Sequence, residues 1–199
     1  MEQLKCLVFA THNANKREEV SKINGAFADY NLIDLQTLEF DAEIKETGST
    51  LKENAFIKAN TIYKKYNYPV FGEDTGLEVS TLNDAPGTYT ARYAGEHKSD
   101  EENMLLLLKN LSNTFNRYAQ FRTVLCYIDK NEIRYFEGIC KGQIAFRKLG
   151  VDGFGYDPIF IPDGYTRSFA EMHLSQKNKI SHRKKAISRL SYFLAQKNI

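Results

Sequence analysis

The chain has no long apolar run and few prolines. Its longest apolar stretches are only a few residues, whereas a membrane-spanning helix needs roughly 20. With 42% hydrophobic residues, 26% charged residues and only 4 prolines, the composition is typical of a globular protein in water, and we predict no membrane partner. The first residues run directly into a strand-like segment without the features of a secretory signal, which favours a cytoplasmic location.

Cysteines are also scarce. Cys6, Cys126 and Cys140 are odd in number, far apart and set in apolar runs. This pattern predicts buried free thiols rather than disulfides or metal ligands.

A strong excess of one charge is missing as well. The net charge is +2, whereas nucleic-acid-binding domains are usually strongly basic, so we predict no nucleic-acid partner. Residues 177–189 are an exception, since they hold six Lys and Arg residues and no acid. A binding module that uses this basic segment for RNA or DNA is therefore the non-enzymatic alternative.

The 199 residues show no internal repeat or linker, which predicts a single domain over residues 1–199. Helical spacing and capping residues predict helices, and runs of β-branched and aromatic residues predict strands. We expect strands at 4–11, 30–35, 68–72, 76–82, 118–129 and 132–146, and helices at 15–23, 48–66, 99–111 and 181–196. The pattern predicts an α/β fold, a mixed sheet with flanking helices whose long middle strands extend into a second lobe.

The segment THNANK, residues 11–16, lies where the first strand passes into a helix. Backbone N–H groups at a helix start favour anions, and Asn13, Asn15 and Lys16 add donors and charge. The glycines of a P-loop are missing. The segment predicts a phosphate site, with a plain helix cap by Asn13 or Asn15 as the alternative.

Acidic residues stand near the ends of predicted elements, Glu46 before a helix and Glu73–Asp74 after a short strand. Magnesium often takes one or two carboxylates together with substrate phosphates, so these acids could form a metal site. The alternative is a solvated turn between two short strands. Residues 74–76 also read Asp-Thr-Gly, like an aspartic protease loop, but Glu73 stands where an apolar residue is usual and the triplet occurs once.

Two further segments suggest a nucleotide. In DGFGYDPIF, residues 152–160, an aromatic ring could stack on a base and Asp157 could accept a hydrogen bond, although Phe154 and Tyr156 could instead fill the core. In KNKISHRKK, residues 177–185, cations at a helix start oppose the helix dipole unless an anion binds there. Together the segments predict a metal-dependent enzyme acting on a nucleoside polyphosphate.

Seven segments, in order and at the expected spacing, resemble the inosine triphosphate pyrophosphatase family, also called XTP/dITP diphosphatases. They are FATHNANKREEV, ETGSTLKENAFIKA, EDTGLEV, APGTYTARYAG, FGYDPIF, AEM and KNKISHRKKA. The resemblance implies an elongated α/β fold with two lobes around a nucleotide cleft, and a homodimer. It also implies hydrolysis of ITP, dITP and XTP to the monophosphate and pyrophosphate, which cleanses the nucleotide pool. The related Maf group, which acts on modified pyrimidines, is a less fitting neighbour.

The resemblance also implies roles for individual residues. Asp74 would be the general base, and Glu46 and Asp74 would bind one Mg²⁺, with Mn²⁺ as an alternative. The substrate-binding residues would be Thr11, His12, Asn13, Ala14, Asn15, Lys16, Lys58 and Lys177 at the phosphates, Thr75 beside the substrate, and Phe154, Gly155, Tyr156, Asp157, His182 and Arg183 at the base. Small departures from the family pattern are Lys45, Glu73, Thr75 and His12.

Overall fold

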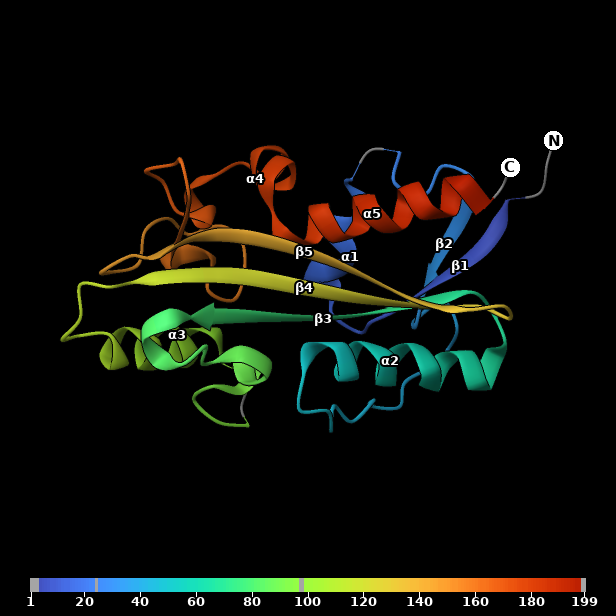
Figure 1. Ribbon diagram of the computed structural model, residues 1–199, viewed down its shortest axis with the longest axis horizontal. Helices are drawn as coiled ribbons and strands as arrows, with labels where there is room; N and C mark the ends of the chain where they lie inside the picture. Colours follow the sequence, from blue (N-terminus) through green and yellow to red (C-terminus); the bar gives the residue numbers. More distant parts are fainter. Residues whose placement is uncertain (1–3, 24, 97–98, 198–199) are drawn as a thin grey trace. The chain divides into compact units, whose positions relative to one another are not determined.

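Six strands are hydrogen-bonded in the order β2-β1-β3-β4-β5-β6 in the computed structural model, which describes residues 4–23, 25–96 and 99–197 (Figure 1). The strands are β1 Lys5–Ala10, β2 Tyr30–Asp34, β3 Val70–Val79, β4 Tyr118–Ile128, β5 Ile133–Ile144 and β6 Phe160–Pro162. Strand β1 pairs in parallel with β2 and β3, while β5 and β6 are antiparallel. The sheet is therefore mixed, as predicted.

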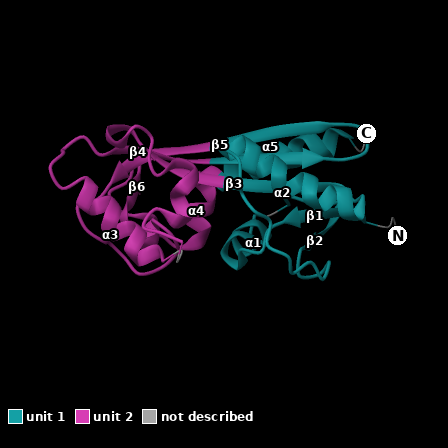
Figure 2. Cartoon of the chain, turned by 90° about the horizontal axis from the view of Figure 1, so that it is seen from below, with its two compact units in different colours: residues 1–74, 123–138, 183–199 teal, residues 75–122, 139–182 magenta. Residues whose placement is uncertain are grey.

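The helices are α1 Ala14–Ser21, α2 Leu51–Tyr66, α3 Asp100–Asn110, α4 Leu174–Ile180 and α5 His182–Lys197. The chain divides into two compact units, coloured separately in Figure 2. Unit 1 comprises residues 1–74, 123–138 and 183–199, and unit 2 comprises residues 75–122 and 139–182. Strands β3, β4 and β5 contribute residues to both units, and each unit has its own apolar core.

Unit 1 has two apolar layers because successive strand residues point to opposite faces. On one face, Val8 and Ala10 of β1 join a core that includes buried residues of α2. On the other face, Leu7 and Phe9 join a core with buried residues of α1 and α5. Helices α2 and α5 accordingly cover opposite faces of the strands (Figure 1).

Unit 2 has a core in which α3 packs its apolar side against aromatic rings. Met104 and Leu107 of α3 belong to the same buried cluster as Phe121, Phe160 and Phe169. The three phenylalanine rings lie with centroids 4.7 to 6.2 Å apart, in the range of favourable aromatic contacts.

Helix starts follow the capping residues as predicted. Thr50 and Glu53 form a capping box at α2, because each side chain accepts a hydrogen bond from the other residue's backbone N–H. Ser99 caps α3 and Asn13 caps α1 through the N–H of Lys16. Capping satisfies backbone donors that a helix start would otherwise leave open.

The predicted turn at Glu73–Asp74 is wrong, because β3 runs without a break from Val70 to Val79. The solvated turn that was the alternative to a metal site is also excluded, because both carboxylates are buried and ion-paired within unit 1. Strand β6 and helix α4 are short and were not predicted, while α5 begins at His182, directly after the expected cap residue Ser181, which also ends α4.

The three cysteines form no disulfide within the described residues, and Cys126 and Cys140 are buried as predicted, whereas Cys6 is only partly buried. Burial raises the pKa of the Cys126 thiol to about 12, so this group is an inert core residue. Among the described residues, no helix is both long and apolar enough to cross a membrane.

Gly72 lies where α2 passes very close to β3. A Cβ at this position would stand 2.3 Å from the carbonyl oxygen of Ala55 and 2.7 Å from the backbone nitrogen of Ala59. Because backbone atoms cannot yield locally, we expect Gly72→Ala to lower the free energy of unfolding by about 1–3 kcal/mol in urea denaturation. Lys64→Ala, an exposed change on the same helix, should stay within about 0.5 kcal/mol, and equal stability of both variants would contradict the prediction.

Candidate active site

Ionisable side chains gather in unit 1 around the middle of β3. This charged cluster consists of Lys16, Glu19, Glu46, Lys58, Glu73, Asp74 and Arg183. Five of its members were predicted site residues, namely Lys16, Glu46, Lys58, Asp74 and Arg183. Glu73 and Asp74 are successive strand residues, so their side chains lie on opposite faces of β3 and have different partners.

Asp74 lies on the face covered by α2. Lys58 Nζ donates to Asp74 Oδ1 at 2.9 Å, and Asn54 Nδ2 donates to Asp74 Oδ2 at 3.2 Å. Asn54 and Lys58 are four residues apart, so α2 presents both on one side. Asn54 was not among the predicted residues, and its spacing from Lys58 on a predicted helix was the available signal.

The pKa values on this face are shifted by burial and by neighbouring charges. Burial raises the pKa of Asp74, although Lys58 and Lys16 act in the opposite direction. Burial alone would lower the pKa of Lys58, but Asp74 and Glu46 hold it above its ordinary value. Burial lowers the pKa of Lys16, and Glu73 offsets part of this effect. Asp74 is therefore a stronger proton acceptor than an exposed aspartate, and Lys58 is a firmly charged cation.

Glu46 and Asp74 are brought together as predicted, because both contact the same ammonium group. Lys58 Nζ lies 3.0 Å from Glu46 Oε1 and 2.9 Å from Asp74 Oδ1. Two converging carboxylates suit a hard cation such as Mg²⁺, which completes its coordination with water and phosphate oxygens. The described part of the chain has no group of three or more His, Cys, Asp and Glu side chains that could hold a metal. The two carboxylates of Glu46 and Asp74 are a donor set that fits Mg²⁺, and the metal itself stays a prediction.

Glu73 lies on the other face, where Arg183 of α5 binds it. Arg183 Nη2 donates to Glu73 Oε1 at 2.8 Å, and Nη1 donates to Glu19 of α1. Lys16 Nζ lies 3.4 Å from Glu73 Oε1. Burial alone would lower the pKa of Arg183, but Glu73 and Glu19 raise it, so the guanidinium stays charged. Two carboxylates hold the predicted base ligand Arg183 inside unit 1, and its role at the base stays a prediction.

Glu19 was not among the predicted residues. It lies at 3% exposure on α1, next to the core residue Val20. Its neighbour Glu18 is exposed and pairs with Lys22, so the sequence pair Glu-Glu contains one buried and one solvated acid. An acid adjacent to an apolar helix position was the only local signal.

The predicted phosphate segment, residues 11–16, is mostly accessible. Thr11 is buried, and its Oγ1 accepts a hydrogen bond from the N–H of Asn13 at 3.1 Å. His12, Asn13, Ala14 and Asn15 are exposed, and the His12 ring stacks on Phe40 with centroids 6.1 Å apart. Asn13 makes the helix cap that was the alternative interpretation, and the cap leaves the accessible residues available to an anion.

In unit 2, residues 150–157 form a loop, here called the glycine loop. Tyr156 is buried in the core and its hydroxyl donates to Thr90 O at 3.0 Å, so the core-filling alternative is correct for Tyr156. Burial raises the pKa of this hydroxyl. Phe154 is only half-buried, which leaves part of its ring accessible. The two aromatic residues predicted to bind the base therefore differ in exposure. Tyr156 is buried, and Phe154 is the accessible ring.

Other predicted residues surround the glycine loop within unit 2. Lys177 Nζ lies 2.6 Å from Asp157 Oδ2 and 4.9 Å from the centroid of the Phe154 ring. The His182 ring stacks on Phe121 at 4.6 Å. Thr75 is half-buried in β3. The predicted site residues thus fall into two groups, a charged one in unit 1 and an aromatic one in unit 2.

The sequence matches the Ham1 family over residues 7–193. This chain belongs to the Ham1 family. The dITP/XTP pyrophosphatase of Christiangramia forsetii is 46% identical over 190 residues, which cover 96% of this chain and 99% of the relative. The solved structure of the Staphylococcus aureus Ham1 protein is 42% identical with a TM-score of 0.89, covering 97% of this chain and all of that one. A HAM1 protein from Coxiella burnetii is 33% identical with a TM-score of 0.88, covering 96% and 99%.

These similarities confirm the predicted family resemblance and the α/β fold. They extend over nearly the whole chain, so both units belong to the Ham1 architecture.

Removal of Glu19 should destabilise this Ham1 protein, because the buried guanidinium of Arg183 would lose one of its carboxylates. We expect Glu19→Ala to lower the free energy of unfolding by about 3 kcal/mol in urea denaturation. Glu18→Ala is the matched control, since Glu18 is an exposed residue of the same helix and should contribute less than about 0.5 kcal/mol. Equal effects of the two substitutions would show that the buried pair does not stabilise the fold.

Proposed function

We propose that this Ham1 protein hydrolyses the deaminated purine nucleotides ITP, dITP and XTP to the monophosphate and pyrophosphate, and so removes them from the nucleotide pool. Relatives named dITP/XTP pyrophosphatase are 43–46% identical to nearly all of this chain. The observation that carries the proposal is the convergence of Glu46 and Asp74 on the Lys58 ammonium. Release of pyrophosphate from a nucleotide needs carboxylates that bind a metal and accept a proton. It also needs a cation that offsets the phosphate charge, and both are found here.

The charge of the cluster supports a divalent cation as part of the site. Lys16, Lys58 and Arg183 stand against Glu19, Glu46, Glu73 and Asp74, so the fully ionised cluster carries more negative than positive charge. A triphosphate would add further negative charge. We therefore propose that Glu46 and Asp74 would hold Mg²⁺, or Mn²⁺, which would act as a Lewis acid and make a water molecule easier to deprotonate.

The chain's own residues then have separate tasks at the phosphates. Asp74 accepts the proton of the water that attacks the α-phosphorus, and its raised pKa suits a general base. Lys16 and Lys58 offset the charge that develops on the phosphates and on the leaving pyrophosphate. The accessible N-terminal end of α1 binds phosphate oxygens through backbone N–H groups.

At the base, the accessible ring of Phe154 stacks on the purine. Asp157 belongs to the loop that carries this ring and Lys177 pairs with Asp157, so we assign both to the base-binding group rather than Lys177 to the phosphates. Donors that meet a 6-keto oxygen reject a 6-amino group, because two donors would face each other without an acceptor. This explains a preference for inosine over adenosine nucleotides.

A homodimer and a cytoplasmic location are parts of the same proposal. The family resemblance supports the homodimer, and the few, widely spaced cysteines support the location. The small net charge of +2 supports a small-molecule substrate in place of a nucleic acid.

The role of Asp74 as general base predicts a large kinetic effect of Asp74→Asn. With ITP, dITP or XTP and Mg²⁺, we expect the rate of pyrophosphate release to fall at least about 100-fold, because the amide cannot accept the proton. The wild type should cleave these nucleotides much faster than ATP. Asp163→Asn, the same change at an exposed residue, should keep wild-type activity. A near-normal rate in Asp74→Asn would exclude the mechanism.

The metal proposal predicts loss of pyrophosphate release when EDTA removes divalent cations, and recovery when Mg²⁺ is added in excess. An inhibitor of aspartic proteases should have no effect, since Asp74 lies within a continuous strand rather than in a catalytic turn. If the protein is dialysed against EDTA and still releases pyrophosphate at the full rate, Glu46 and Asp74 act without a metal.

A further inference from the structure

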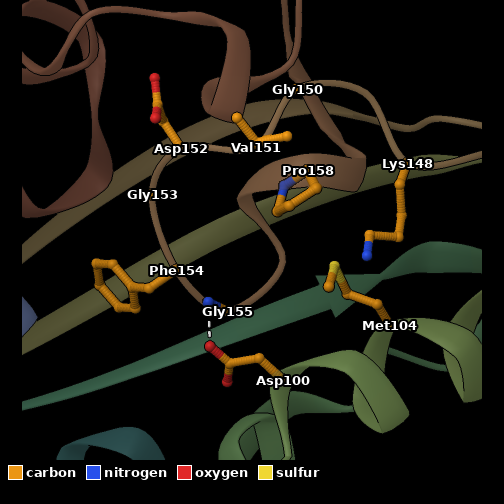
Figure 3. Close-up of a pocket in the computed structure, with 10 residues that line it drawn as sticks. All are labelled: Asp100, Met104, Lys148, Gly150, Val151, Asp152, Gly153, Phe154, Gly155 and Pro158. Atoms are coloured by element: carbon orange, nitrogen blue, oxygen red, sulfur yellow. Dashed lines mark hydrogen bonds between the residues drawn. The ribbon is translucent and has the colours of Figure 1, made fainter.

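Phe154 is flanked by two glycines with a left-handed backbone. Phe154 stands between Gly153 and Gly155, which have φ angles of 79° and 60°, in the region that glycine adopts at low cost (Figure 3). Glycines on both sides reduce the local restraint on the ring. The position of the ring therefore depends on the hydrogen bonds that hold these peptide groups.

Two carboxylates hold the two successive amides at this position. Asp157 Oδ2 accepts from the N–H of Phe154 at 3.0 Å, and Asp100 Oδ2 accepts from the N–H of Gly155 at 2.7 Å, the bond drawn in Figure 3. Asp157 belongs to the glycine loop itself. Asp100 is the first residue of α3 and comes from 55 positions away in the sequence.

Helix α3 is a firm support for Asp100. Ser99 caps its first turn, Met104 and Leu107 are buried in the core of unit 2, and Asn103 bonds to the backbone of Ala91 and Ala94. The positive end of the helix dipole also favours a negative side chain at this position. A carboxylate on a fixed helix can thus define where the neighbouring loop lies.

Side-chain packing does not replace this bond. A cavity of about 350 Å³ lies between α3 and the glycine loop, lined by Asp100, Met104, Lys148, Val151 and Pro158 among others (Figure 3). Val151 is almost fully exposed, so the first part of the loop has little apolar contact there. The hydrogen bond from Gly155 to Asp100 joins the glycine loop to α3 beside this cavity.

We propose that Asp100 is a positioning residue that fixes the Phe154–Gly155 peptide and thereby the ring that stacks on the purine. This inference rests on the proposed function for the identity of the ligand. Asp157 is held by Lys177 and Tyr156 by Thr90, so the end of the loop has its own restraints. Asp100 restrains the part that carries the accessible ring.

The variant Asp100→Ala tests this inference. We expect the KM for ITP to rise about five- to tenfold with kcat changed less than about twofold, a size that suits loss of one exposed charge-assisted hydrogen bond. Inhibition by inosine monophosphate should weaken in parallel, whereas inhibition by inorganic pyrophosphate should not change. Hydrogen–deuterium exchange of the peptide covering residues 150–158 should become faster.

The control is Glu102→Ala, which removes the same charge from the same helical turn but leaves the Gly155 amide bonded. Asp100→Asn keeps an acceptor oxygen, so its exchange rate and its KM for ITP should lie closer to those of the wild type than to those of Asp100→Ala. Equal behaviour of Asp100→Ala and Glu102→Ala would overturn the inference. A wild type that releases no pyrophosphate from ITP would instead refute the proposed function, while the exchange measurement would still decide whether Asp100 holds the loop.

Discussion

Strand β3 carries two adjacent carboxylates into the interior of unit 1, and the strand's alternation sends them to opposite faces. A buried carboxylate is costly unless a cation or several donors meet it, so each face must supply its own partner. Helix α2 supplies Lys58 to Asp74, and α5 supplies Arg183 to Glu73. The placement of both helices and the charge of the site thus depend on this one pairing requirement.

The close approach of α2 to β3 serves the same requirement. Gly72 and Asp74 lie two residues apart on the same face of the strand, and Gly72 leaves room for the backbone of α2 beside Ala55 and Ala59. A side chain at Gly72 would push this helix, which carries Lys58, away from the strand. Stability and the proposed chemistry therefore rely on the same contacts, and a change to one affects the other.

Unit 2 solves a different problem, because its loop must expose an aromatic ring without losing its position. Glycines at 153 and 155 permit the required backbone, and Asp157 and Asp100 accept hydrogen bonds from the two consecutive peptide groups that flank the Cα of Phe154. In both units ionised carboxylates hold functional groups in place, through cations in unit 1 and through backbone amides in unit 2.

The sequence by itself determined the elements whose signals are local. Capping residues and helical spacing placed α2 and α3, β-branched and aromatic runs placed β4 and β5, and the ordered motifs indicated the family and paired Glu46 with Asp74. Only the tertiary structure decided that Glu73–Asp74 lie in a continuous strand. It alone also showed that Glu19 binds Arg183, Asn54 binds Asp74 and Asp100 binds the Gly155 amide. Glu19 meets Arg183 across 164 positions and Asp100 meets Gly155 across 55. Local patterns report which residues neighbour one another along the chain, whereas the partner that makes a buried charge tolerable comes from wherever the fold brings it.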